Sequence, residues 1–394
     1  MLNTPFSPWP SFSEEEVAAV SSVLRSNKVN YWTGQEGRQF EKEFADYTEC
    51  KYAVAVANGT LALDLALKSL DIKKGDEVVV TSRTFIASIS CVINAGATPV
   101  FADIDLASQN ITAESIQQVL TEKTKAVICV HLAGWPCEMD EIMSLAESNN
   151  LYVIEDCAQA HGAKYKGRSV GSIGHIGAWS FCQDKIMTTG GEGGMLTTND
   201  EHLWRTAWAF KDHGKSYAAV YEKEHPPGYR WLHESFGTNW RLTEMQSAIG
   251  RIQTARMPLW RKSRSTYANK ILSCCKAYDF IYVPDIPSYI EHAFYKCYAF
   301  IKPQLLPNTW TRDKIIAAFN EKGVPCYSGS CSEVYLEKAF DGKSYKPSQP
   351  LPKAKQLGET SLMFLVHPTL SDDEIALTCQ TINEIFTEIA DTNK

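Results

Sequence analysis

A serine and a lysine lie five residues apart in GAWSFCQDKIMTTGGEGG, residues 177–194: Ser180 and Lys185. A lysine held away from bulk water can lose its proton and condense with an aldehyde to form a Schiff base. The glycines within residues 190–194 would let the backbone pass close to a cofactor. A loop lysine is more often a solvated surface charge, however, and clustered glycines usually form only a turn. The role of Lys185 therefore depends on which other groups join it.

A second polar cluster follows an apolar run in IEDCAQAHGA, residues 154–163, and contains Glu155, Asp156, Gln159 and His161. A carboxylate at this point could pair with a protonated ring nitrogen and keep it cationic, which a carbanion-stabilising cofactor requires. The alternative is that Asp156 caps the next turn and that His161 is a structural histidine.

A third cluster, Asn58, Gly59 and Thr60, separates the apolar run YAVAVA from the helical pattern LALDLALKSL. The unpaired N–H groups and the positive dipole end of a helix N-terminus suit a phosphate. Gly59 would permit close approach of the backbone, and Thr60 would add a hydroxyl. The alternative is that Asn58 or Thr60 only caps the helix.

An aromatic residue, Phe85, follows another apolar run in TSRTFIAS, residues 81–88, and could lie flat on a planar ring. Packing in the core is the competing interpretation for a single aromatic side chain. Cys182 could act as a nucleophile by its position, but no His-Asp pair adjoins it, so we interpret it as a packing residue.

These clusters need elements that bring them together, and the chain supplies short apolar runs that alternate with helical stretches. We expect strands at residues 52–57, 77–82, 98–103, 125–131 and 151–156. Continuous apolarity is typical of strands covered on both faces, and the alternation with helices predicts a mostly parallel α/β sheet. Ligands of such sheets gather at the carboxyl ends of the strands, where the polar clusters lie.

The rest of the chain divides around this sheet. Ser13 and Glu16 have capping-box spacing and open a helix over residues 13–27 that places Val17, Val20 and Leu24 on one face. A second helix is indicated around residues 40–47. Further strands are expected at 177–182 and 193–198, and a long helix from about residue 241. We place a domain boundary near residue 255, so that a large domain, residues 1–255, precedes a smaller α+β domain, residues 256–394, which ends in a helix.

Composition excludes several classes of protein. The 394-residue chain carries 39 Lys and Arg against 46 Asp and Glu, a net charge of −7 without a long run of like charge, which argues against nucleic-acid binding. Its 12 cysteines show no spacing of the zinc-site kind, so we expect free thiols and no metal site. No leader pattern and no membrane-spanning stretch is found, so we expect a cytoplasmic protein.

Taken in order, the polar clusters resemble the DegT/DnrJ/EryC1/StrS family of sugar aminotransferases, which are fold-type I pyridoxal-phosphate enzymes. The motifs that carry the resemblance are TGQEGRQFEKEFADY, NGTLALDLAL, EDCAQAHGA, SFCQDKIMTTGGEGGML and GTNWRLTEMQSAIG. They extend from about residue 30 to residue 253. Five motifs in the family's order are far more specific than any one of them.

The resemblance implies a role for each candidate cofactor residue. Lys185 forms the Schiff base with pyridoxal 5'-phosphate, Asp156 meets the pyridine nitrogen, and Gln159 lies near the ring hydroxyl. Phe85 stacks on the ring. The implied phosphate ligands are Gly59, Thr60, Ser180 and, from the neighbouring subunit, Asn239. The resemblance therefore implies a homodimer with shared active sites.

The reaction that the resemblance implies runs in two halves. An amino acid, L-glutamate, leaves its amine on the cofactor, and a nucleotide-linked keto sugar then collects it, which predicts ping-pong kinetics. One branch of the family has histidine in place of the lysine and dehydrates its substrate, so Lys185 argues for amino transfer. VPCYSGSCSEVYLEKAF, residues 324–340, resembles the subgroup that aminates C4 of dTDP-4-keto-6-deoxyhexoses. We therefore predict dTDP-4-keto-6-deoxyglucose as acceptor, in polysaccharide or glycoconjugate biosynthesis such as that of O-antigen.

Several alternatives and contacts stay open at this point. The acceptor could be a UDP- or GDP-linked keto sugar or a keto-cyclitol, and the chain could also be a non-enzymatic, cofactor-binding regulatory protein. Aromatic and basic residues that could contact a sugar, base or diphosphate are Tyr31, Trp32, His213, Lys215, Arg230, Tyr327 and Ser328. Exposed aromatic and charged residues are also common without any such role.

Overall fold

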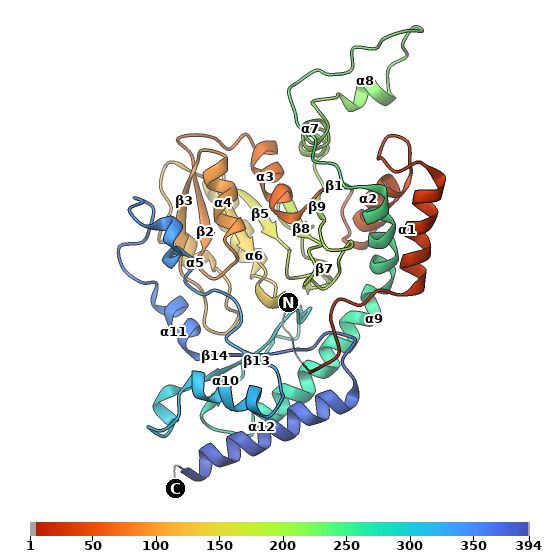
Figure 1. The fold of residues 1–394 in the computed structure, drawn as a ribbon. Helices are drawn as coiled ribbons and strands as arrows, with labels where there is room; N and C mark the ends of the chain where they lie inside the picture. The colour runs from red at the N-terminus through yellow and green to blue at the C-terminus, as the bar shows by residue number, and fades with distance from the viewer. Residues whose placement is uncertain (1–4, 393–394) are drawn as a thin grey trace.

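The computed structural model describes residues 5–392, and its centre is a seven-stranded sheet in the order β1-β9-β8-β5-β4-β2-β3 (Figure 1). The strands are β1 Tyr52–Val56, β2 Glu77–Thr81, β3 Thr98–Ala102, β4 Thr124–Val130, β5 Tyr152–Asp156, β8 Ile176–Ser180 and β9 Gly194–Thr198. The strands from β8 to β3 are parallel, and β9 runs antiparallel to both of its neighbours. The predicted mostly parallel sheet is confirmed.

Helices cover both faces of this sheet, as the continuous apolarity of its strands predicted. The helices are α3 Gly59–Ser69, α4 Ala87–Asn94, α5 Ala113–Gln117, α6 Met139–Asn149 and α7 Glu201–Lys211. Alternate residues of one strand enter different cores: Val78 and Val80 pack with α3 and α4, whereas Val79 packs with α5 and α6. Pro99 lies in β3, at the edge of the sheet, where a missing N–H is tolerated.

A second, smaller body has its own core and antiparallel sheets. Its four-stranded sheet, β10-β12-β14-β13, consists of Ile281–Tyr282, Cys297–Ile301, Ser361–Phe364 and Cys326–Tyr327. Helices α10 Arg312–Glu321, α11 Pro352–Thr360 and α12 Asp372–Thr392 accompany it. A three-stranded sheet joins β11 Ile290–Glu291 to β6 Lys164–Tyr165 and β7 Arg168–Ser169. The smaller α+β part of the predicted fold is confirmed.

One helix, α9 Glu244–Cys275, joins the two bodies (Figure 1). It begins after Thr243, whose capping box with Gln246 starts the helix three residues later than expected. Its first half packs against α1 Glu14–Ser26 and α2 Glu36–Tyr47, and its second half packs against α12. Residue 255 lies inside this unbroken helix, so the predicted boundary does not coincide with a linker and stays a prediction.

The N-terminal helix α1 forms as predicted but turns a different face inward. Val17 and Leu24 are 53% and 52% exposed, whereas Glu16 is buried against α9. The Glu16 carboxylate accepts a hydrogen bond from Gln253 Nε2 at 2.7 Å and pairs with Arg256 at 3.0 Å. This buried polar network, which apolar periodicity does not reveal, orients α1.

The segment after α7 projects away from the rest of the chain (Figure 1). It contains the short helix α8 Tyr217–Tyr221, and beyond it Tyr229, Trp231 and Phe236 are 78%, 86% and 99% exposed. None of the 12 cysteines, all of which lie within residues 5–392, forms a disulfide in the structure, and most of them are buried. Among residues 5–392, no helix combines the length and the apolar character needed to cross a membrane.

Candidate active site

A cavity of about 600 Å³ lies at the carboxyl ends of β1, β2, β5 and β8. The structure brings seven of the sequence-predicted cofactor residues together around it: Gly59, Thr60, Phe85, Asp156, Gln159, Ser180 and Lys185. These residues come from four separate stretches of the chain, and the parallel order of the strands is what places them at one edge of the sheet.

The first wall of the cavity is the N-terminus of α3. Asn58 caps this helix, because its Oδ1 accepts a hydrogen bond from Leu61 N at 3.0 Å, so the alternative capping role is correct for Asn58. Gly59 and Thr60, the first two helical residues, carry N–H groups that have no acceptor within the helix. A Cβ on Gly59 would lie 2.4 Å from the Cβ of Ser180, so only glycine fits there. The N-terminus of α3 and the end of β8 therefore lie in contact, with Gly59 close to the hydroxyl of Ser180.

Asp156 ends β5 and is 6% exposed. Its carboxylate accepts hydrogen bonds from Ser88 Oγ at 2.8 Å and from Ala158 N at 3.1 Å. Burial raises the pKa of Asp156 above its usual range, and the hydrogen bond from Ser88 opposes the rise only in part. Asp156 is therefore a buried acid whose ionised form lacks sufficient stabilisation from the protein alone.

The preceding acid, Glu155, is buried as deeply but has a different environment. It accepts hydrogen bonds from His131 Nε2 at 2.9 Å and from the backbone N–H groups of Gly171, Ile173 and Gly174. Burial would raise its pKa, but these donors hold the pKa of Glu155 below its ordinary value. Glu155 is thus a satisfied structural carboxylate that fixes the loop before β8, and Asp156 is the acid left facing the cavity.

Lys185 reaches the cavity from the loop after β8. Its side chain is 15% exposed, and its Nζ lies 4.0 Å from Asp184 Oδ1 and 5.1 Å from the centre of the Tyr295 ring. Trp9 Nε1 donates a hydrogen bond to the backbone oxygen of Lys185 at 2.8 Å. The lysine is therefore shielded, which contradicts the surface-charge alternative. Trp9 and Tyr295 were missed in the sequence because they are far from residue 185 in the chain.

Of the remaining residues in the predicted clusters, Gln159 and Phe85 line the cavity and His161 does not. Gln159 Oε1 accepts a hydrogen bond from Ala133 N at 3.0 Å, which orients this side chain at the cavity. Phe85 is 68% exposed and lines the cavity, so the core-packing alternative does not hold for it. His161 is buried beside Trp179 and Phe181, and burial lowers its pKa to about 3. His161 is therefore a neutral packing residue.

The structure does not bring the predicted substrate contacts to this cavity. Tyr31 is 4% exposed, and its hydroxyl donates to Glu41 Oε2 at 2.9 Å, so burial beside α2 and α7 removes it from any substrate in the cavity. Asp212 accepts hydrogen bonds from Trp32 Nε1 at 2.7 Å and Lys215 Nζ at 3.1 Å. The others lie outside the cavity lining: His213, Arg230, Tyr327, Ser328 and the predicted phosphate ligand Asn239.

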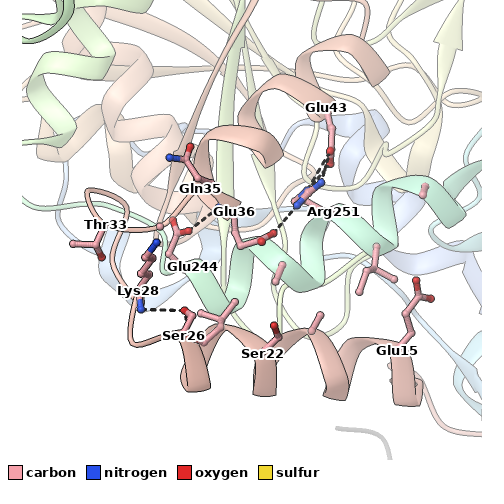
Figure 2. A pocket seen from close by; sticks show the side chains of 16 residues that line it. Glu15, Ser22, Ser26, Lys28, Thr33, Gln35, Glu36, Glu43, Glu244 and Arg251 are labelled. Carbon is pink, nitrogen blue, oxygen red and sulfur yellow. Dashed lines mark hydrogen bonds and ion pairs between the residues drawn. The ribbon is translucent and has the colours of Figure 1, made fainter.

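A separate cavity of about 760 Å³ lies between α1, α2 and α9 (Figure 2). Arg251 bridges Glu36 and Glu43 there at 2.7 Å each, and Glu244 accepts hydrogen bonds from the backbone of Glu36 and Gly37. None of the predicted site residues lines it. Arg251 and Glu244 make contacts that hold α2 and α9 together, so we assign this cavity no chemistry.

Comparison with known proteins shows which family this chain is similar to along most of its length. The profile of the DegT/DnrJ/EryC1/StrS aminotransferase family matches residues 10–383. GDP-perosamine synthase of Escherichia coli O157:H7 is 34% identical over 390 residues, which cover 96% of this chain and 98% of that protein.

Two solved structures extend the comparison. An aminotransferase from Psychrobacter cryohalolentis superposes with a TM-score of 0.97 at 66% identity and covers 98% of this chain and 100% of its own. A protein of Streptococcus pneumoniae, described as a sugar aminotransferase in its PLP form, superposes with a TM-score of 0.85 at 25% identity and covers 98% and 100%. These likenesses, with the sheet order, confirm the predicted fold-type I architecture.

Proposed function

Since this chain belongs to the DegT/DnrJ/EryC1/StrS aminotransferase family, we propose that it aminates C4 of a nucleotide-linked 4-keto-6-deoxyhexose with L-glutamate as donor. The enzyme is a pyridoxal-phosphate-dependent sugar aminotransferase. Its product would enter polysaccharide or glycoconjugate biosynthesis. The observation that carries the proposal is the convergence of Lys185, Asp156 and the N-terminus of α3 on one cavity.

The residues of this cavity fit pyridoxal phosphate. The free N–H groups of Gly59 and Thr60 and the hydroxyls of Thr60 and Ser180 suit its phosphate. Asp156 is a buried acid that forms no ion pair within residues 5–392, and a protonated ring nitrogen beside it would lower its raised pKa. Lys185 provides a shielded amine for the aldehyde.

Pyridoxal phosphate, when bound, supplies a ring that accepts the electron pair released when a substrate C–H bond breaks. Asp156 would hold the proton on the ring nitrogen, because a buried carboxylate stabilises a neighbouring cation. Lys185 Nζ would take a proton from the α-carbon of the donor in the first half-reaction and would deliver a proton to the former keto carbon of the acceptor in the second. Phe85 and Gln159 would orient the ring. Ser88 would keep the Asp156 carboxylate in place through its 2.8 Å hydrogen bond.

The nucleotide of the acceptor has two favoured candidates. The segment at residues 324–340 resembles the subgroup that uses dTDP-4-keto-6-deoxyglucose, which is our first choice. A relative at 34% identity over 96% of this chain is named GDP-perosamine synthase, which supports a GDP-linked sugar as the second candidate. UDP-linked sugars complete the set to be tested.

A panel of acceptors tests the proposed function. We expect the holoenzyme, given L-glutamate, to aminate a 4-keto-6-deoxyhexose linked to one of dTDP, GDP or UDP, with product mass and NMR locating the new amine at C4. A keto-cyclitol and the nucleotide-free sugar serve as controls. Amination of the keto-cyclitol alone, or cofactor binding without turnover on any acceptor, would contradict the proposal and favour the rival functions.

We also propose that the active enzyme is a homodimer with shared sites. Asn239 is exposed at the base of the projecting segment and does not line the cavity of its own chain, which supports a role at the site of a second copy. The exposed Tyr229, Trp231 and Phe236 on the same segment would gain cover in such a dimer.

Mixed dimers test the shared site. We expect Asn239→Ala to weaken cofactor retention. In a mixture of Lys185→Ala and Asn239→Ala chains, each heterodimer would hold one site with both native residues, so activity should rise toward about a quarter of wild type. The measurement is the specific activity of the mixture, compared with the specific activity of each variant alone. Absence of any recovery in dimers shown to exchange subunits would refute sharing.

A further inference from the structure

A second cavity of about 600 Å³ lies beside the first, and the proposed function leaves it without a role. The N-terminal residues 6–9, the loop before Lys185, α9, the start of β12 and the chain after β14 enclose it. Its apolar and aromatic walls include Phe6, Trp9, Tyr295, Met363 and Leu365. Its charged, amide and imidazole side chains are Gln183, Asp184, Arg264, Lys296 and His367. The cavity has the mixed lining typical of small-molecule sites.

The feature that points to a ligand is Arg264. It is 2% exposed, its Nη1 donates to the carbonyl of Phe294 at 3.3 Å, and its Nε has no hydrogen-bond partner. Its guanidinium lies 5.3 Å from the Trp9 ring. Burial lowers the pKa of Arg264 to about 9, because no carboxylate among the described residues compensates its charge. A buried, unpaired guanidinium is costly unless an anion joins it.

The two other basic groups of the cavity differ from Arg264. Lys296 Nζ donates to Ser330 Oγ at 3.2 Å and lies 5.4 Å from the Tyr295 ring, and no ion pair among residues 5–392 uses it. Burial lowers the pKa of His367 to about 4, so this imidazole is neutral. The cavity therefore offers a ligand two cationic side chains, the deeply buried Arg264 and the less buried Lys296.

The second cavity adjoins the amine of Lys185. Asp184 lines both cavities, and its Oδ1 lies 4.0 Å from Lys185 Nζ. Tyr295 lines the second cavity, its ring centre is 5.1 Å from the same Nζ, and its hydroxyl donates to Asp184 Oδ2 at 2.5 Å. A small molecule held by Arg264 can therefore lie next to the reacting amine.

We propose that this second cavity binds the dicarboxylate amino donor, with Arg264 receiving one carboxylate and Lys296 assisting as the second cation. The inference rests on the proposed aminotransferase function and names the side chains that select its donor. A guanidinium fork matches a carboxylate in a bidentate geometry. The aromatic and aliphatic walls suit the methylene groups between the two carboxylates of an amino acid such as glutamate.

An unreactive dicarboxylate provides the direct test. We expect isothermal titration of the holoenzyme with glutarate to show binding, and Arg264→Gln to weaken it by roughly tenfold or more, the loss typical of a hydrogen-bonded charge. Arg261→Gln is the matched control, since Arg261 lies three residues earlier on α9 and pairs with Glu291 instead. Its affinity for glutarate should equal that of wild type.

A second variant guards against a folding defect. Arg264→Lys keeps the charge and loses the fork, so it should bind glutarate with an affinity between those of wild type and Arg264→Gln. If neither Arg264 variant changes glutarate affinity, or if wild type does not bind glutarate, the inference is overturned. It is also overturned if dTDP or GDP displaces glutarate and loses affinity in the same variants, because the cavity then serves the nucleotide.

Separate half-reactions distinguish this inference from the proposed function. Enzyme loaded with pyridoxamine phosphate should aminate the keto sugar equally well in wild type and Arg264→Gln, whereas the KM for glutamate should rise in the variant. Failure of the loaded wild-type enzyme on every sugar would refute the proposed function alone. Equal glutamate KM values in the two proteins would refute the donor site alone.

Discussion

Replacement of Lys185 by alanine is expected to lower amino transfer by roughly a thousandfold or more, because a positioned proton-transfer group alone contributes about 10²–10⁴-fold. Lys185 is the one lysine among the described residues that line the cavity, so no neighbouring amine can take its place. Its side chain is only 15% exposed, so the amine is held away from bulk water and close to the groups that line the cavity. The variant should fold normally, since among residues 5–392 the lost amine contacts only Asp184, at 4.0 Å, and the face of the Tyr295 ring, at 5.1 Å from its centre.

The measurement is steady-state turnover, combined with borohydride reduction and peptide mass mapping. The wild-type protein should carry the reduced cofactor on the peptide that contains Lys185, and the alanine variant should carry none. Lys185→Arg keeps the charge but cannot form the bond and should be equally inactive. Lys164→Ala removes a half-buried lysine that pairs with Glu49 outside the cavity, and this variant should behave as wild type. Unchanged turnover in Lys185→Ala would disprove the assignment.

Substitution of Asp156 by asparagine is expected to lower turnover by roughly 30- to 5,000-fold, because loss of one partner of a buried charge pair costs about 2–5 kcal/mol. The amide keeps the size of the side chain and the hydrogen bond from Ser88 but cannot stabilise a protonated ring nitrogen. Burial already raises the pKa of Asp156, so the folded state disfavours its ionised form. At neutral pH the cofactor-free variant should therefore be at least as stable as the cofactor-free wild type.

Thermal unfolding of the cofactor-free proteins and turnover of the reconstituted ones check this pair of effects. Glu155→Gln is the control at the neighbouring position. The pKa of Glu155 is lowered in the folded state, so its ionised form adds stability above its unfolded pKa, and this stability is lost as pH falls. Glu155→Gln should therefore lower the unfolding temperature at neutral pH. If Asp156→Asn instead lost stability and kept its turnover, Asp156 would be a structural acid.

The convergence of Gly59 and Asp156 on one cavity was predictable from sequence because its signals are local. Gly59 and Asp156 each lie two residues beyond the end of an apolar run, and the carboxyl ends of parallel strands meet at one edge. Trp9, Tyr295 and Arg264 carry no such signal. Their positions depend on where the N-terminal segment, β12 and α9 pack, which only the three-dimensional arrangement shows.

The predicted substrate contacts do not line the cavity of their own chain, and for Tyr31 the physical reason is burial. An aromatic residue beside a TG turn can be exposed or buried, and periodicity does not distinguish the two. In the structure the hydroxyl of Tyr31 finds a partner in Glu41, whose other oxygen pairs with the buried Lys211 at 2.6 Å. Such polar networks within a core are set by residues far apart in the chain, as they are for Glu16 on α1.

The contact between Gly59 and Ser180 restricts how this enzyme can change over evolutionary time. A Cβ at position 59 would lie 2.4 Å from the Cβ of Ser180, so position 59 can gain a side chain only in a lineage in which position 180 loses its own. The close packing of the start of α3 against the end of β8 therefore keeps position 59 a glycine. Variation that retunes the accepted sugar must accumulate elsewhere, in side chains that do not share this contact.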